Sequence, residues 1–181
     1  MDTMINTLSA VLFDESVLRL RIRELGTELS KAFLGKDPIL IGVLKGSVIF
    51  LSDIMRAMTI PVEIDFMSIS SYGSSAVSSG EIKIKKNIEI DIKGRHVIIV
   101  EDIVDTGLSL QFLKDYLNSY EPISVVSCVL LDKPSAHQID IKIDYIGFEI
   151  GNDFVVGYGL DFAENYRNLP YIGILKEEVY K

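Results

Sequence analysis

The stretch VIIVEDIVDTGLS, residues 97–109, decides how this chain folds. Its first four residues are apolar and predict a buried strand, which runs out into the carboxylates Glu101, Asp102 and Asp105. A turn of small and hydroxyl-bearing residues follows, and helical periodicity begins at Leu108. Ligands of open α/β sheets bind where the carboxyl ends of strands meet the amino ends of helices. We therefore expect a binding site at this turn.

Strands and helices alternate on both sides of this stretch. The apolar periodicity predicts helices over residues 14–34, 46–58 and 108–116, and strands over 39–44, 62–69, 97–100, 123–131 and 143–150. Strands separated by helices indicate βαβ units, which form a mostly parallel sheet covered on both faces. The last third of the chain is richer in short strands and turns, so we expect it to form a smaller lobe rather than a separate domain.

The composition indicates one globular domain without a large polyanion-binding surface. The chain has 181 residues and a net charge of −8, from 18 basic and 26 acidic side chains, whereas nucleic-acid and membrane surfaces need a basic face. The single cysteine, Cys128, excludes an internal disulfide and lies in an apolar run typical of a buried strand. His96 and His137 lack metal-ligand spacing. The N-terminal residues show no signal-peptide pattern, so we expect a cytoplasmic protein.

The residues after the strand predict a ligand with two chemically different ends. Glu101 and Asp102 can accept hydrogen bonds from neutral sugar hydroxyls. The turn can offer backbone N–H groups and the hydroxyls of Thr106 and Ser109 to a phosphate, and Gly107 lets the backbone approach closely. A ribose 5-phosphate satisfies both ends.

The stretch resembles the phosphoribosyl pyrophosphate motif of the phosphoribosyltransferase family, and the resemblance extends from about Ile39 to about Leu175. VLKGS (43–47) is similar to the family's pyrophosphate loop, and SSYG (70–73) to its mobile loop. LDKP (131–134) and FVVGYGLD (154–161) resemble the purine site of the bacterial hypoxanthine-guanine branch. The resemblance implies the type I α/β fold over residues 1–181, with a mostly parallel sheet flanked by helices and a small hood lobe formed from the N-terminal and C-terminal segments.

The resemblance also implies an activity. Members of this branch transfer the 5-phosphoribosyl group from phosphoribosyl pyrophosphate to N9 of hypoxanthine or guanine, giving IMP or GMP and pyrophosphate in purine salvage. They use Mg²⁺ and usually form homodimers or homotetramers. The resemblance leaves hypoxanthine, guanine and xanthine unranked as substrates.

Site residues follow from the resemblance position by position. It implies that Asp105 is the general base, and that Glu101 and Asp102 orient the ribose hydroxyls and hold Mg²⁺. It also implies that Asp161 holds a second Mg²⁺. The further substrate-binding residues that it implies are Lys45, Gly46, Ser71, Tyr72, Thr106, Gly107, Leu108, Ser109, Lys133, Phe154, Val155 and Arg167. Among these, Lys133 would recognise the 6-oxo group, Phe154 would stack on the purine and Arg167 would contact the pyrophosphate. The family also leads us to expect a cis peptide between Lys45 and Gly46 in some states, and a loop over 71–80 that closes over the substrates.

Five positions, in three places along the chain, depart from the family pattern. Leu108 stands where the eukaryotic branch has a lysine, which removes a charge near the phosphate. Ala136 and His137 stand where many bacterial relatives have two arginines, so we expect His137 to approach the pyrophosphate and to make its affinity depend on pH. Gly-Asn at 151–152 replaces a more usual Pro-Asp before the stacking Phe154.

Other interpretations of these residues remain open at this point. Asp-Thr-Gly also occurs in aspartic proteases, which need two copies in an all-β fold, and Asp105 or Thr106 can simply cap the helix. Phe154 can be a core residue, Lys133 a solvent-facing loop residue, and Asp161 a salt-bridge partner of Arg167. The 71–80 segment can be a surface loop. Among other functions, a nucleic-acid-binding regulator on the same fold would need a basic face. A phosphoribosyltransferase for adenine, xanthine or a pyrimidine is a further alternative, and Lys133 and the stretch 154–161 favour a 6-oxopurine as substrate.

Overall fold

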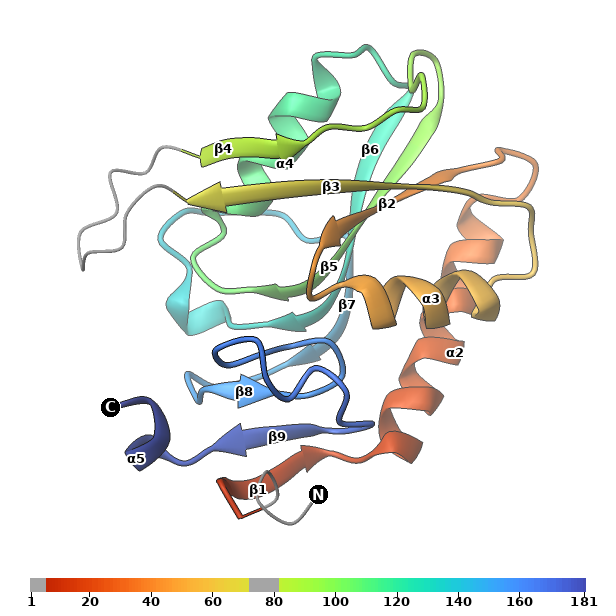
Figure 1. Cartoon of the computed structure of the whole chain (residues 1–181). Coiled ribbons are helices and arrows are strands. Elements are labelled where there is room, and N and C mark those ends of the chain that lie inside the picture. Colours follow the sequence, from red (N-terminus) through yellow and green to blue (C-terminus); the bar gives the residue numbers. More distant parts are fainter. Residues whose placement is uncertain (1–5, 72–81) are drawn as a thin grey trace.

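The computed structural model describes residues 6–71 and 82–181, except for the side chain of Ser71. A six-stranded sheet forms its centre, in the order β4-β3-β2-β5-β6-β7 (Figure 1). The strands are β2 (Ile39–Leu44), β3 (Glu63–Ser71), β4 (Ile82–Lys86), β5 (His96–Val104), β6 (Ser124–Asp132) and β7 (Tyr145–Glu149). All neighbours are parallel except β3 and β4. The predicted α/β class with a mostly parallel sheet is therefore confirmed.

The central strand β5 is longer than the apolar run that predicted it. Val97 to Val100 are fully buried, as expected, but the strand continues through Glu101 and Asp102 to Val104. The extension exists because β6 is equally long, so that Ile103 and Val104 still find ladder partners on it. The two carboxylates therefore lie within the end of the strand rather than after it.

Helices cover both faces of the sheet (Figure 1). They are α2 (Glu15–Ala32), α3 (Val48–Ala57) and α4 (Leu108–Asn118), with the short η1 (Pro134–Ala136) and α5 (Glu177–Tyr180) elsewhere. Because side chains alternate along a strand, Ile98 and Val100 pack with α2 and α3, whereas Val97 and Ile99 pack with α4. At the start of α2, the Asp14 carboxylate accepts hydrogen bonds from two backbone amides and caps the helix.

A second, three-stranded sheet joins the two ends of the chain. Its strands are β1 (Leu8–Phe13), β9 (Ile172–Leu175) and β8 (Val155–Val156), all antiparallel. Figure 1 places this small sheet on the side of β7, the last strand of the large sheet. Short strands were expected in the last third of the chain, but β1 was not expected, and neither was β4.

Two further expectations concern burial and membranes. Cys128 is fully buried in β6, and burial raises the pKa of its thiol to about 12. It is therefore a packing residue, as predicted. None of the helices in residues 6–71 and 82–181 combines the length and the apolar character that crossing a membrane requires.

Candidate active site

The turn between β5 and α4 is shaped for close approach of a ligand. Gly107 is the N-cap of α4 and has a left-handed conformation, with φ of 83°, which glycine adopts without strain. A Cβ there would lie 3.0 Å from Ile141 and 3.2 Å from Ile139. The Thr106 hydroxyl accepts a long 3.4 Å bond from the Leu108 amide, so side-chain capping is weak and the Asp105 alternative is wrong. The first-turn amides of α4, which lack intrahelical partners, can receive an anion.

A cavity of about 380 Å³ lies next to this turn. Five segments contribute to it, from the ends of β2, β3 and β5, from the first turn of α4 and from the loop before β9. Its lining is Val43, Leu44, Lys45, Gly46, Ile69, Ser70, Glu101, Asp102, Ser109, Asp161 and Arg167. The fold thus brings together seven of the residues predicted from the sequence, although they are spread over more than half of the chain.

Two acidic side chains in this cavity have few partners. The Oε2 atom of Glu101 is buried without any hydrogen-bond partner among the described residues. Burial raises the pKa of Glu101 well above its ordinary value, and the neighbouring Asp102 raises it further. Burial also raises the pKa of Asp102 to about 6, although a backbone hydrogen bond from Ile103 and the charge of Arg167 act in the opposite direction. Both carboxylates would therefore gain from a cation or from hydroxyl donors.

At Gly46, the loop that resembles the family's pyrophosphate loop contacts the rest of the site. A Cβ at Gly46 would overlap the Asp102 carboxylate, and a Cβ at Gly159 would overlap the Gly46 carbonyl oxygen. Gly159 also has a φ of 102°, so glycine is required there by conformation as well as by space. Three segments that are distant in sequence therefore meet at Gly46.

The cis peptide of this loop lies one residue earlier than expected. It joins Leu44 to Lys45, and not Lys45 to Gly46. The β2 ladder ends at Leu44, which pairs with Ser68, so this peptide is the first one after the strand that is free to leave strand geometry. The sequence pattern indicates the loop, but it does not indicate which of its peptide bonds is cis.

Charged side chains form a network at the rim of the cavity. The Arg167 guanidinium lies 2.8 Å from the Asp161 carboxylate and donates to the Gly159 carbonyl at 2.8 Å. The Lys45 ammonium donates to both oxygens of Glu164, at 3.0 and 3.1 Å, and Arg167 reaches Glu164 at 3.3 Å. The Asp161–Arg167 salt bridge considered as an alternative is thus present. Glu164 was missed, because nothing in its local sequence indicates that the distant Lys45 converges on it together with Arg167.

The predicted purine-binding residues lie away from this cavity lining. Lys133 is buried at the end of β6, and its amide donates to the Val104 carbonyl at 3.0 Å, so the solvent-facing alternative is wrong. Val155 is buried in β8. The Phe154 ring stacks on Tyr180, with ring centres 4.9 Å apart, and meets Phe162 edge-on, which supports the core-packing alternative for that residue.

His137 follows Lys133 closely and has a defined partner. Its Nε2 atom lies 2.7 Å from the Asp132 carboxylate, which is buried. The next amide, that of Gln138, donates to the Thr106 carbonyl at 3.0 Å. This segment therefore connects the purine side to the phosphate turn, and the expected approach of His137 to pyrophosphate stays a prediction. Tyr72, the side chain of Ser71 and the rest of the expected 71–80 loop lie outside the described residues.

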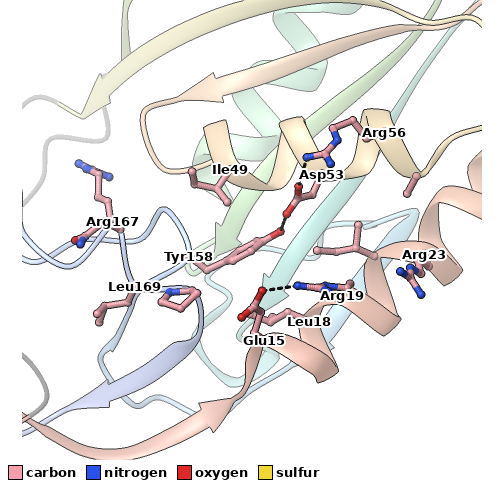
Figure 2. Close-up of a pocket in the computed structure, with 14 residues that line it drawn as sticks. Glu15, Leu18, Arg19, Arg23, Ile49, Asp53, Arg56, Tyr158, Arg167 and Leu169 are labelled. Atoms are coloured by element: carbon pink, nitrogen blue, oxygen red, sulfur yellow. Dashed lines mark hydrogen bonds and ion pairs between the residues drawn. The ribbon is translucent and has the colours of Figure 1, made fainter.

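A larger cavity, of about 660 Å³, lies between α2, α3 and residues 158–170. Figure 2 shows Tyr158 crossing it toward Asp53, and the phenol donates to that carboxylate at 2.6 Å. Among the predicted site residues only Arg167 lines it, at its edge. The chemistry expected from the sequence therefore belongs to the smaller cavity.

Comparisons with known proteins identify the family. A family profile described as "Phosphoribosyl transferase domain" matches residues 13–163. A hypoxanthine-guanine phosphoribosyltransferase of Streptococcus agalactiae is 48% identical over 175 residues, which is 97% of each chain. The bifunctional protein TilS/HprT of Listeria monocytogenes is also 48% identical, and the present chain spans 28% of its length.

Solved structures show the same relationship. The crystal structure of a hypoxanthine phosphoribosyltransferase from Staphylococcus aureus superposes with a TM-score of 0.95 at 43% identity, covering 99% of this chain and 97% of that one. A ternary substrates complex of a mutant hypoxanthine phosphoribosyltransferase from Trypanosoma cruzi gives a TM-score of 0.92 at 38% identity, covering 97% of this chain and 100% of that one. The expected resemblance is confirmed, and the chain belongs to the phosphoribosyltransferase family, in its hypoxanthine-guanine branch.

Proposed function

We propose that this chain transfers the 5-phosphoribosyl group from phosphoribosyl pyrophosphate to N9 of hypoxanthine or guanine, giving IMP or GMP and pyrophosphate in purine salvage. One observation carries the proposal. Two underpaired carboxylates, the buried Glu101 and the half-buried Asp102, share a cavity with Lys45 and Arg167, beside a helix N-terminus. Sugar hydroxyls, pyrophosphate and 5-phosphate each have a complementary partner in this arrangement.

The ribose 5-phosphate would lie along the end of β5. Thr106, Gly107, Leu108 and Ser109 would hold its phosphate through first-turn amides and two hydroxyls. Glu101 and Asp102 would accept hydrogen bonds from the ribose hydroxyls. Their negative charge would also stabilise the positive charge that develops on the sugar as the bond from C1′ to pyrophosphate breaks.

Proton transfer would fall to Asp105. This residue is exposed on the turn, two positions before the N-cap of α4. As the purine N9 bonds to C1′, the ring must lose a proton, and a carboxylate within reach can accept it. On the other side of the sugar, Lys45, Gly46 and Arg167 would hold the departing pyrophosphate. Ser71, the last residue of β3, and Tyr72 would be further substrate-binding residues.

The donor set fits a magnesium ion. Mg²⁺ prefers oxygen ligands and often takes only one or two protein carboxylates, together with substrate oxygens and waters. The described residues contain no group of three or more acidic, His or Cys side chains placed to hold a metal, but Glu101 and Asp102 line one cavity with an unpartnered buried oxygen. These two would hold the ion, and Asp161 would hold a second one. When bound, the metal would supply positive charge that stabilises the negative charge of the departing pyrophosphate.

Base selection would rest on Lys133. Its ammonium has three donors and no acceptor, so it matches the 6-oxo group of hypoxanthine or guanine and opposes the 6-amino group of adenine. Burial of Lys133 supports this role, because an unpaired ammonium in a dry site is unfavourable. Phe154 would stack on the base, and the backbone of Val155 would contact its edge.

The remaining features complete the proposal. Residues 1–181 would form one domain, with the small sheet β1-β9-β8 acting as a hood beside the site. The protein would work in the cytoplasm as a homodimer or homotetramer. The net charge of −8 supports the absence of nucleic-acid and membrane partners.

The test is a turnover assay with phosphoribosyl pyrophosphate, Mg²⁺ and each of hypoxanthine, guanine, xanthine and adenine. We expect turnover of hypoxanthine and guanine, none of adenine, and loss of activity in excess chelator. Full activity in chelator would contradict the metal assignment, and absence of turnover with every 6-oxopurine would contradict the function.

Lys133→Met keeps the aliphatic stem and removes the donors. We expect kcat/KM for hypoxanthine and guanine to fall by up to about 10⁴-fold, as for sites built around one polar partner, and discrimination against adenine to shrink. Lys31→Met, at an exposed position on α2, is the matched control. Survival of hypoxanthine use with adenine still excluded would move base selection to the backbone around Val155.

A further inference from the structure

The two cations of the small cavity share one carboxylate. Lys45 and Arg167 are the basic residues in its lining, and both form ion pairs with Glu164, at 3.0 Å and 3.3 Å. Glu164 is 119 positions from Lys45 in the sequence. The fold therefore places a negative charge where two predicted pyrophosphate-binding cations converge.

The two cations are held differently. Arg167 also pairs with Asp161 and donates to the Gly159 carbonyl, so Glu164 is one of several partners. For Lys45, Glu164 is the only ion-pair partner among the residues that the structure describes. The Lys45 and Glu164 side chains are each 66% exposed, and ion pairs at such exposure are weak. A ligand with several negative charges can therefore displace Glu164 from Lys45.

The backbone presents this carboxylate in an unusual way. Glu164 has a φ of 62°, and Ala163 and Tyr166 also have positive φ values, which are uncommon for residues other than glycine. The Glu164 amide donates to the Asp161 carboxylate at 2.9 Å, and Phe162 and Asn165 pair across the turn. The turn is therefore built around contacts that direct Glu164 to the rim, and such left-handed residues cluster at functional sites.

We infer that Glu164 is an affinity-determining residue of the pyrophosphate end of the site, whose carboxylate competes with pyrophosphate for Lys45 and, to a lesser degree, for Arg167. The inference rests on the proposed function, since it takes Lys45 and Arg167 as the pyrophosphate-binding residues. In this arrangement the cations always have a counter-charge. When pyrophosphate departs, the return of Glu164 to Lys45 offsets the contact that is lost, so Glu164 favours product release.

The experiment measures pyrophosphate binding by calorimetry in the presence of Mg²⁺, which requires no turnover. Glu164→Gln keeps the shape of the side chain and removes its charge. We expect pyrophosphate to bind about three- to tenfold more tightly to this variant, the range for removing one or two exposed competing ion pairs. Inhibition of the forward reaction by pyrophosphate should strengthen by the same factor.

The chain offers a matched control in Glu121. It also has a positive φ, of 56°, is 71% exposed and pairs with a lysine, Lys93, and it belongs to no part of the proposed site. Glu121→Gln should leave pyrophosphate binding unchanged. Equal tightening in both variants would show an effect of net charge alone and would overturn the inference, as would unchanged or weaker binding in Glu164→Gln.

A double-mutant cycle identifies the cation involved. In a Lys45→Met background, Glu164→Gln should tighten pyrophosphate binding much less, because the main competition is gone. The same gain with and without Lys45 would contradict the inference. Thermal melts show that each variant is folded, and Glu164→Asp, which keeps the charge on a shorter stem, should lie between the wild type and Glu164→Gln. Failure of the wild type to turn over any 6-oxopurine would refute the proposed function instead, and is read separately from these binding data.

Discussion

Buried carboxylates occur in two settings in this protein. Asp65, on β3, accepts three backbone hydrogen bonds, from Phe66 at 2.7 Å, Glu89 at 2.6 Å and Ile90 at 3.0 Å. Glu101, on β5 of the same sheet, has a buried oxygen with no hydrogen-bond partner among the described residues. The adjacent, half-buried Asp102 accepts a hydrogen bond from the Ile103 amide. The fold satisfies the first carboxylate completely and leaves the other two underpaired.

The pKa values follow this difference. Burial alone would raise the pKa of Asp65, but the backbone hydrogen bonds from Glu89, Ile90 and Phe66 outweigh it and hold that pKa below its ordinary value. For Glu101 and Asp102, burial dominates and both pKa values are raised. The comparison indicates that Asp65 stabilises the fold, whereas the carboxylates at the end of β5 are kept for a ligand.

The largest effect should come from Asp105, the proposed general base. Asp105→Asn should lower kcat by about 10²-fold or more, since general-base catalysis contributes about 10²- to 10⁴-fold. Phosphoribosyl pyrophosphate should still bind, and the free energy of unfolding should stay within about 0.5 kcal/mol because the side chain is exposed. Steady-state kinetics and urea unfolding measure both. Asp115→Asn, an exposed change on α4, is the control, and near-normal kcat in Asp105→Asn would remove the residue from catalysis.

A smaller effect concerns Asp102, whose burial should lower the free energy of unfolding of the protein without substrate. Its pKa is about 6 in the folded state against an ordinary value of 3.8, so the folded state binds the proton more tightly. The free energy of unfolding should then fall as pH rises from about 4 to about 6, by at most about 3 kcal/mol. Urea unfolding in chelator, without substrate, measures this fall, and Asp102→Asn should reduce it. An identical pH profile in the variant would mean that Asp102 is not protonated more readily in the fold.

Asp65 should behave with the opposite sign. Its pKa is lowered in the folded state, so the stability it provides is present above its ordinary pKa of 3.8 and is lost as pH falls through the folded-state value. Asp65→Asn should lower the free energy of unfolding near neutrality by about 1–2 kcal/mol, because an amide replaces a charged acceptor. It should flatten the loss at acid pH and leave kcat unchanged. A large loss of kcat in folded Asp65→Asn protein would contradict the conclusion that Asp65 serves the fold and not the site.

Asp132 represents an intermediate case, because its partner is the side chain of His137. His137→Arg gives this carboxylate an arginine as its side-chain partner, so we expect kcat and the KM for pyrophosphate in the reverse reaction to change by less than about threefold, the scale of a weak pair. If His137 approaches pyrophosphate, any pH dependence of pyrophosphate affinity between about pH 6 and 8 should flatten in this variant, because arginine keeps its charge over this range. An unchanged pH profile would leave His137 with a structural role only.

Continuous apolar runs predicted much of the fold. The central strands β2, β5 and β6 are buried on both faces, so their sequences are apolar over most of their length and their positions were predicted to within a few residues. β1 and β4 were missed because they lie at sheet edges and expose about half of their residues. The strand structure of each depends on pairing with another strand, β9 for β1 and β3 for β4, which the pattern of its own residues does not contain.

The same distinction applies to the site. The turn after β5 was predicted because its residues are consecutive and their chemistry is specific. Glu164 and the Asp132–His137 pair were not predicted, because their importance depends on which charges the fold brings near them. Phe154 shows the reverse case, since its motif suggested stacking on a base and the structure gives its ring an internal partner, Tyr180.

The contact between Gly159 and Gly46 has a consequence for how the protein loses activity. The pyrophosphate loop rests against a turn whose neighbouring strand, β8, is held by β9, and β9 in turn by β1. Small peripheral elements open at lower free energy than a core sheet. Undocking of the three-stranded sheet would separate Gly159 from Gly46 while the six-stranded sheet stayed intact. In mild denaturant, turnover should therefore disappear before the circular-dichroism signal of the large sheet, and activity would report the first local opening of the molecule rather than its global unfolding.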